Sequence, residues 1–282
     1  MSSNSDVAFS EAASSLLASR FNSLDELKTV IDISYGKTIN NASRVNLIYK
    51  DRGYTIKSVL TSGINQEHLS NAQNSSNLEK IKLTICAPYA IRQRENLKNI
   101  LLMARRRPSI FWPGDIAFYD LAVSFEDKIT SQKSAYLNYK DSSEKGYINT
   151  FNHVNAQIFI TALFSENIAD YIADVHERYA MPELTTGNFS PEQLSDTINY
   201  PVDNYVDLIN NEIGQEIGLA LKKKYNLNDK TIWSAQLLTD FLNDIQIYYI
   251  RSMNICFEPF DCDEDLVIKF SRKINAIKNT NF

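Results

Sequence analysis

The sequence is poor in the residues that build disulfide and zinc frameworks. Its 282 residues include three cysteines, Cys86, Cys256 and Cys262, and no CxxC pair. Neither a disulfide scaffold nor a zinc ribbon is therefore indicated. Cys256 and Cys262 flank the short segment FEPFD and could pair in an oxidising compartment, but we expect free, buried thiols.

Long apolar runs, a basic leader and an excess of positive charge are also absent. No segment reaches about 18 consecutive apolar residues, so we expect no transmembrane segment. The start of the chain, MSSNSDVAFSEAASSLLASRF, has no basic region and is not expected to act as a Sec signal peptide. Any export would use a machine that does not read a cleaved signal. The formal net charge of −5 disfavours a generic nucleic-acid binder, which would usually be basic.

Several common catalytic motifs are missing as well. The chain has no GxSxG elbow, no P-loop, no dinucleotide fingerprint and no HExxH pair. His176 and Glu177 lie in the segment HERYA, which lacks the second histidine of a zincin. A metalloprotease of that type is therefore not indicated.

Hydrophobic periodicity predicts a mainly α-helical protein with a smaller N-terminal α+β region. In the N-terminal part we expect two short helices within 7–33, a hairpin at 44–61, a polar loop at 63–77, a third strand at 79–87, a helix at 89–106 and mostly helix at 115–140. In the C-terminal part we expect helices at 149–164, 166–180, after Pro201, 231–251 and 264–278. The segment YKDSSEKG, 139–146, is the best candidate boundary, which gives an α+β region over 1–146 and a helical catalytic domain over 147–282.

The most unusual stretch is 200–218, YPVDNYVDLINNEIGQEIG. At helical period its residues separate into two faces. The polar face carries Asp203, Asn204, Asp207, Asn210, Asn211, Gly214 and Gly218. Short amides and carboxylates are poor helix formers, and each glycine costs about 1 kcal/mol relative to alanine. We interpret this polar face, whose residues disfavour a helix, as a face that binds another molecule. The alternative is that its side chains only cap and bridge neighbouring helices.

Two of the three histidines precede that stretch closely. His153 and Gln157 are four residues apart and share a helical face, and His176 is followed by Glu177. Packed beside Asp207 and its neighbouring amides, these side chains would form a polar cluster inside a helical bundle. A lone histidine is more often structural than catalytic, but two histidines near such a helix favour a site.

Three blocks of this region occur in order: Asn149, Phe151 and His153; then Ala173, His176 and Glu177; then Val206, Asp207, Leu208, Asn210, Asn211 and Gly214. Their order resembles an uncharacterised bacterial domain of polymorphic-toxin and Rhs-type C-termini, with the pattern D-A-F-R-H, A-H-E and M-D-L-x-N-N-x-x-G-R. The likeness covers about 148–218. Asn149, Asn152 and Gln215 replace the first Asp and two Arg of that pattern. The resemblance implies an antibacterial effector or toxin. Residues 173–178, ADVHER, are also similar to the family-19 chitinase helix that ends in His-Glu-Thr, which hints at the lysozyme-like class.

The first functional hypothesis is a cell-envelope hydrolase that cleaves peptidoglycan glycan strands without a cofactor. Glu177 would be the general acid and Asp207 would orient water or stabilise the cation, since glycoside hydrolysis needs two carboxyl groups. The catalytic candidates are His176, Glu177 and Asp207, and the substrate-binding candidates are His153, Gln157, Asp203, Asn210 and Asn211.

Two alternatives remain open. In one, His153, His176 and Asp207 bind a divalent metal ion, Glu177 is the base, and the substrate is a phosphoester or a phospholipid. In the other, the protein is a non-enzymatic adaptor or inhibitor. An effector made in the bacterial cytoplasm would need a secretion machinery to deliver it outside the cell or into a target periplasm. Its producer would also need a cognate immunity protein, which we expect to plug the cleft.

Overall fold

The computed structural model describes residues 16–37, 43–51, 53–61, 64–74, 77–195 and 201–279. The first part of the chain comprises α1 (Leu17–Arg20), α2 (Leu24–Leu27), β1 (Ile31–Lys37), β2 (Ser43–Asp51), β3 (Tyr54–Leu60), α3 (Gln66–Asn74), α4 (Asn77–Cys86), α5 (Pro88–Arg92), α6 (Arg94–Ala104), α7 (Phe118–Asp127) and α8 (Gln132–Ala135). The second part comprises α9 (Tyr147–Leu163), α10 (Glu166–Ala180), α11 (Glu183–Thr186), α12 (Pro191–Ser195), α13 (Pro201–Lys224), α14 (Ala235–Met253) and α15 (Asp265–Asn279). The protein is therefore mainly helical with a small α+β region, as predicted.

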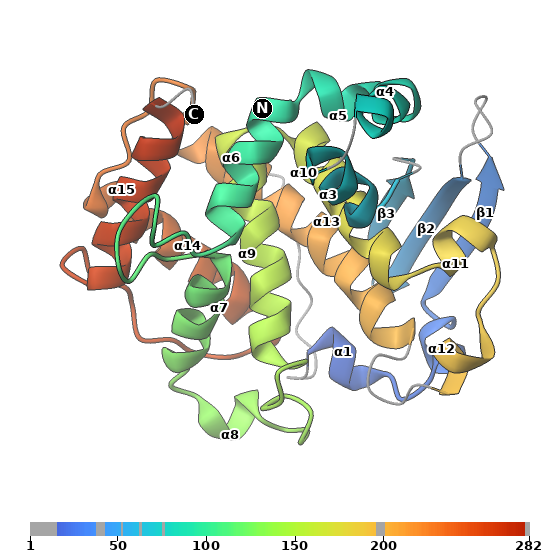
Figure 1. Cartoon of the computed structure of the whole chain (residues 1–282). Coiled ribbons are helices and arrows are strands. Elements are labelled where there is room, and N and C mark those ends of the chain that lie inside the picture. The colour runs from blue at the N-terminus through green and yellow to red at the C-terminus, as the bar shows by residue number, and fades with distance from the viewer. Residues whose placement is uncertain are drawn as a thin grey trace, which may run out of the picture.

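A three-stranded antiparallel sheet of order β1-β2-β3 lies at one side of the molecule (Figure 1). Alternate residues of β2 and β3, such as Val45, Leu47 and Ile56, are buried, as the period-2 pattern of a half-buried sheet requires. They form a hydrophobic core with Tyr205 and Leu208 of α13. The sheet thus packs against the face of α13 that carries Tyr205 and Leu208.

Helices α9 and α13 cross at the centre of the molecule (Figure 1). A Cβ atom added at Gly214 would lie 2.6 Å from the carbonyl oxygen of Val154, and one added at Gly218 would lie 2.8 Å from that of Ile158. The two glycines therefore let the α9 backbone approach α13 more closely than any side chain would permit. This contact explains why a helix tolerates their cost.

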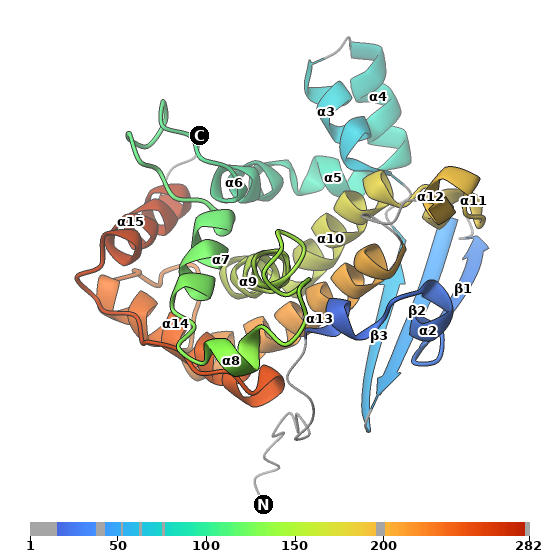
Figure 2. The same cartoon turned by 90° about the horizontal axis from the view of Figure 1, so that it is seen from below.

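A larger core fills the other side of α9. Buried aromatic rings such as Phe125 of α7, Phe159 of α9, Phe241 of α14 and Phe270 of α15 pack in this cluster. The α3–α4 hairpin lies beyond α10 and projects from the bundle in Figure 2. Among the described residues, no helix is long and apolar enough to cross a membrane.

Three secondary-structure predictions were wrong. Residues 31–37 form strand β1 rather than the end of a helix, because the helix that Ser23 caps ends after one turn at Leu27. Residues 79–87 lie largely in helix α4 rather than in a third strand. The alternation in KIKLTI suits a strand, but the apolar residues 78, 81 and 85 also have helical spacing, and here the helix prevails. The predicted polar loop at 63–77 contains α3.

The three cysteines are free and exposed, so the expectation of buried thiols was wrong. The segment 139–146, which was predicted as a domain boundary, precedes α9. Both main hydrophobic cores nevertheless contain residues from either side of position 146. The first predicted helix within 7–33 lies mostly outside the described residues.

Candidate functional site

The crossing of α9 and α13 brings the polar faces of both helices together with α10. His153 extends from α9 between two carboxyl groups. Its Nε2 lies 3.4 Å from Oδ2 of Asp207 on α13, and its Nδ1 lies 3.6 Å from Oε1 of Glu177 on α10. Because the backbones touch at Gly214, a ring one turn away on α9 reaches the α13 carboxyl directly.

Two side-chain amides hold these groups in place. Asn211 contacts His153 Nδ1 through its Oδ1 at 3.1 Å and donates from Nδ2 to Glu177 Oε1 at 3.0 Å. Asn149 donates to Asp207 Oδ1 at 3.0 Å. Each carboxyl therefore has an amide donor as well as the imidazole nearby. Such a network of buried polar groups positions its members accurately.

His176 completes the cluster from the exposed side. Its ring centroid lies 5.9 Å from that of His153, and its Nδ1 lies 3.2 Å from Oε1 of Gln66 on α3. Three atoms that could bind a metal ion lie within 4.8 Å of one another. They belong to His153, His176 and Glu177, one atom each. Two imidazoles and a carboxylate at such distances could bind a divalent metal ion.

The environment shifts the protonation equilibria of this cluster. Burial raises the pKa of Glu177 to about 8; the neighbouring His153 and Asn211 oppose that rise, and Asp207 adds to it. Burial, with the charge of Asp203, also raises the pKa of Asp207 well above its ordinary value. Burial in the cavity wall and the neighbouring His153 lower the pKa of His176. Because the His176 ring keeps contact with solvent, we expect this lowering to be smaller than in a fully buried imidazole.

The other predicted site residues lie around the cluster rather than in it. Asp203 pairs with Lys145, whose Nζ lies 2.7 Å from Oδ2. Gln157 accepts a hydrogen bond from Gln215 and lines a cavity. Asn210 is buried next to Asp207 on α13 and favours the charged form of that carboxyl.

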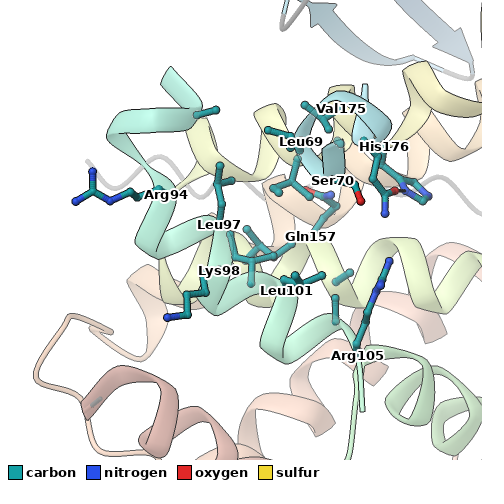
Figure 3. A pocket seen from close by; sticks show the side chains of 18 of the residues that line it. Leu69, Ser70, Arg94, Leu97, Lys98, Leu101, Arg105, Gln157, Val175 and His176 are labelled. Atoms are coloured by element: carbon teal, nitrogen blue, oxygen red, sulfur yellow. Dashed lines mark hydrogen bonds between the residues drawn. The ribbon is translucent and has the colours of Figure 1, made fainter. Parts of the chain in front are cut away.

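A cavity of about 720 Å³ opens beside the cluster. Its walls come from α3, α4, α5, α6, α7, α9, α10 and α13 and are mainly apolar, including Leu69, Leu83, Leu97, Leu101, Ile160 and Ile172. His153, His176 and Asn211 also line it, whereas Glu177 and Asp207 do not. In Figure 3, His176 lies at one end and Arg94 and Lys98 at the other, with Leu97 and Leu101 between them. The imidazoles are thus the reactive groups that a bound molecule would meet.

Sequence reasoning missed three contributors to this region. Gln66 was assigned to a polar loop, although Asn65 accepts a hydrogen bond from the His68 N–H in an N-cap arrangement that could have indicated α3. Asn149 was noted for its position in a block but not as the donor to Asp207. Helix α6 was predicted, but no periodic pattern reveals that its apolar residues line a cavity rather than a core.

Comparisons of the chain with protein-family models, with curated proteins and with solved structures found no match.

Proposed function

We propose that the protein is a hydrolase in which His153, His176 and Glu177 hold a divalent metal ion at the wall of the cavity. The observation that carries the proposal is the convergence of these three ligand groups within 4.8 Å at the end of a cavity large enough for a substrate. Two histidines and one glutamate form a ligand set known from catalytic zinc sites, which keep one position open for water.

Each of the three ligands has a neighbour that would orient it. Asp207 lies against Nε2 of His153, Gln66 contacts Nδ1 of His176, and Asn211 donates to Glu177. Outer carboxyl and amide partners of this kind fix the orientation of metal ligands and strengthen binding. The sequence-based metal hypothesis placed Asp207 among the ligands, whereas the distances favour Glu177 as the ligand and Asp207 as the orienting group.

The lowered pKa of His176 suits a ligand, because only the neutral imidazole binds a metal. Burial raises the pKa of Glu177, and the neighbouring His153 offsets that rise only in part. A divalent ion would offset it further and favour the carboxylate. The metal would lower the pKa of a bound water to about 7. The resulting hydroxide would add to the ester carbon or phosphorus, the bond to the alcohol oxygen would break, and the alcohol would leave with a proton.

Cleavage of glycan strands is the second candidate. Its support is the raised pKa of Glu177, because a general acid must stay protonated near neutral pH. The side chains of Glu177 and Asp207 are only 3% and 7% exposed, however, and neither lines the cavity. A sugar chain would have to displace His153 to reach them, so we prefer the metal-assisted hydrolase.

The biological setting rests on the three ordered sequence blocks. They support an antibacterial effector delivered by a secretion machinery and neutralised by an immunity protein at the cavity mouth. Expression in a bacterial host, once in the cytoplasm and once with an export signal, tests the setting. Toxicity only on export supports an envelope target, and no toxicity in either compartment speaks against an effector.

The metal site itself is tested by calorimetric titration of the chelator-treated full chain with Zn²⁺ and Mn²⁺. We expect one ion per chain for the wild type and a loss of that binding in His153→Ala and Glu177→Gln. His68→Ala is the matched control, because His68 is exposed on α3 and hydrogen-bonds to Asn65, away from the three proposed ligands. Hydrolysis of p-nitrophenyl esters and of bis-p-nitrophenyl phosphate should follow metal content. Release of glycan fragments from peptidoglycan in the presence of chelator would instead favour the second candidate.

A further inference from the structure

We infer that the α3–α4 hairpin docks on the surface of an anionic lipid bilayer and that the cavity binds an acyl chain of a lipid from that bilayer. The inference rests on the proposed hydrolase and names its substrate class, an acyl lipid. Three observations on different residues carry it: an exposed apolar helix face, a local concentration of positive charge, and a continuous apolar cavity that ends at the two histidines.

Helix α4 presents large apolar side chains to solvent. Leu78, Ile81 and Ile85 are 73%, 59% and 74% exposed, respectively. Their spacing of three and four residues places them on one face of the helix. Leu83, by contrast, packs toward the core of the hairpin with Val175. An apolar face that stays uncovered on a projecting hairpin is typical of an interaction surface.

The same region carries a positive charge that the rest of the chain does not share. Residues 77–107 contain eight Lys or Arg and two acidic residues, a local charge of +6 in a chain whose net charge is −5. Lys80 and Lys82 lie on α4 itself, beside the exposed apolar residues. A helix with apolar residues on one face and lysines at its sides is suited to the interface of an anionic bilayer. There the burial of apolar surface and the attraction between lysines and anionic lipids both contribute to binding.

The exposed helix also forms part of the cavity wall. Lys80, Leu83 and Thr84 of α4 line the cavity, together with the apolar residues of α6 and α10. A lipid chain that leaves the bilayer beside α4 would pass around this helix to reach the cavity on its other face. An alkyl chain needs no hydrogen-bond partners, which matches the apolar middle of the cavity between Leu69 and Leu101.

Arg105 lies at the histidine end of the cavity. Its side chain points toward His176 in Figure 3, and its guanidinium has no hydrogen-bond or ion-pair partner among the described residues. An anionic headgroup or a free carboxylate would supply that partner, since arginine binds carboxylate and phosphate through two parallel hydrogen bonds. The charged end of a lipid would thereby be placed beside His153 and His176.

Co-sedimentation of the full chain with vesicles tests the docking. Vesicles of phosphatidylcholine alone are compared with vesicles that also contain phosphatidylglycerol. We expect binding to the anionic vesicles, and about a tenfold or greater loss of affinity in Leu78→Ser/Ile81→Ser/Ile85→Ser. Ile232→Ser is the matched control, because Ile232 is 78% exposed just before α14, on the other side of the bundle from α4 (Figure 1). No binding of the wild type, or equal binding of the triple variant, overturns the inference.

A fluorophore on the exposed Cys86 provides a second measurement of docking. In a variant whose Cys256 and Cys262 are replaced by serine, an environment-sensitive label at Cys86 should shift to the blue when anionic vesicles are added. A chain that instead uses this face to bind a second copy would be dimeric in solution and become monomeric in the triple variant. That outcome, with no blue shift on vesicles, would also overturn the inference.

Displacement of a dansyl-labelled fatty acid by oleate tests the cavity. We expect the wild type to bind the probe and Ala156→Trp, which fills the cavity from α9, to weaken binding tenfold or more. Leu101→Trp fills the same space from α6 and replaces the first variant if that one loses its helical circular dichroism. Undiminished binding in a folded cavity variant contradicts the inference.

Glu177→Gln separates the two proposals, because Glu177 is a proposed metal ligand that does not line the cavity. It should bind vesicles and oleate like the wild type while losing metal and hydrolysis. If the wild type binds vesicles but no metal, the docking stands and the proposed hydrolase fails. If it binds metal but neither vesicles nor oleate, the hydrolase stands and the lipid inference fails.

Discussion

Replacement of Gly214 by alanine should loosen the helix crossing on which the site depends. The new Cβ would lie 2.6 Å from the Val154 carbonyl oxygen and 2.7 Å from the Gln157 Cβ. Ordinary contact begins near 3.4 Å, so α9 and α13 must separate locally by up to about 0.8 Å. Neither obstacle is the end of a flexible side chain, and neither can swing aside. Overpacking of this kind costs typically 1–3 kcal/mol.

The gain in helix propensity opposes that cost by about 1 kcal/mol. We therefore expect Gly214→Ala to lower the free energy of unfolding by up to about 2 kcal/mol, which corresponds to at most roughly 8 °C in Tm. Separation of the helices would also move His153 away from Asp207, the group that orients its ring in the proposed site, so metal affinity should fall as well. Urea denaturation and metal titration of the same sample measure both effects.

Gly36→Ala is the matched control for this experiment. A Cβ at Gly36 meets nothing within 4 Å, and its backbone is not in the left-handed region. This variant should keep the wild-type stability and metal affinity. Equal or higher stability of Gly214→Ala, with metal binding unchanged, would refute the argument that close backbone approach builds the site.

Three further predictions concern single groups. The metal-free wild type should lose stability as pH rises from about 4.5 to about 8, because the folded chain keeps the Glu177 proton over that range and the unfolded chain releases it. Glu177→Gln should remove this loss. Parallel curves of unfolding free energy against pH for the two proteins, measured in urea, would contradict this. Asp115→Ala leaves the fully buried Lys273 without its ion-pair partner at 2.9 Å and should cost about 3–5 kcal/mol in thermal or urea unfolding, whereas Asp265→Ala removes an exposed pair and should cost about 1 kcal/mol or less. Ser234→Ala removes the side-chain cap of α14 and should cost about 1 kcal/mol, and no change in unfolding free energy would mean that the cap contributes nothing.

The C-terminal helices could be predicted because local signals agree with the tertiary structure there. Ser165 caps α10 through its hydroxyl, and α10 spans residues 166–180, as its periodicity predicted. Ser234 caps α14 in the same way. Where caps, apolar spacing and helix formers indicate the same element, the prediction succeeds.

The predictions failed where the local pattern was ambiguous. Residues 31–33 were predicted as the end of a helix, but they begin strand β1, which pairs with β2 from Ile31↔Tyr49 to Lys37↔Ser43. Pairing with a distant strand cannot be read from local periodicity. Residues 79–87 alternate like a strand, yet β1, not this segment, occupies the free edge of β2. In both cases the long-range contact decided the structure.

The site was partly predictable because its residues lie on three helices whose polar and apolar faces can be assigned from the helical periodicity. His153, Glu177, Asp207 and Asn211 were selected from that phase, and the structure brings them together. The spacing could not distinguish a ligand from an orienting group, since that depends on distances across the helix crossing. It could not reveal the cavity either, because eight helices, from α3 to α13, contribute residues to its walls.

Anomalous diffraction from crystals grown with Zn²⁺ or Mn²⁺ would locate the proposed metal ion. We expect one strong peak bounded by His153, His176 and Glu177, at about 2.0–2.2 Å from a nitrogen of each imidazole and an oxygen of the carboxylate. The peak should vanish in crystals of His153→Ala grown in the same way. No peak among these three side chains at saturating metal, or a peak held by other residues alone, would contradict the proposed metal centre.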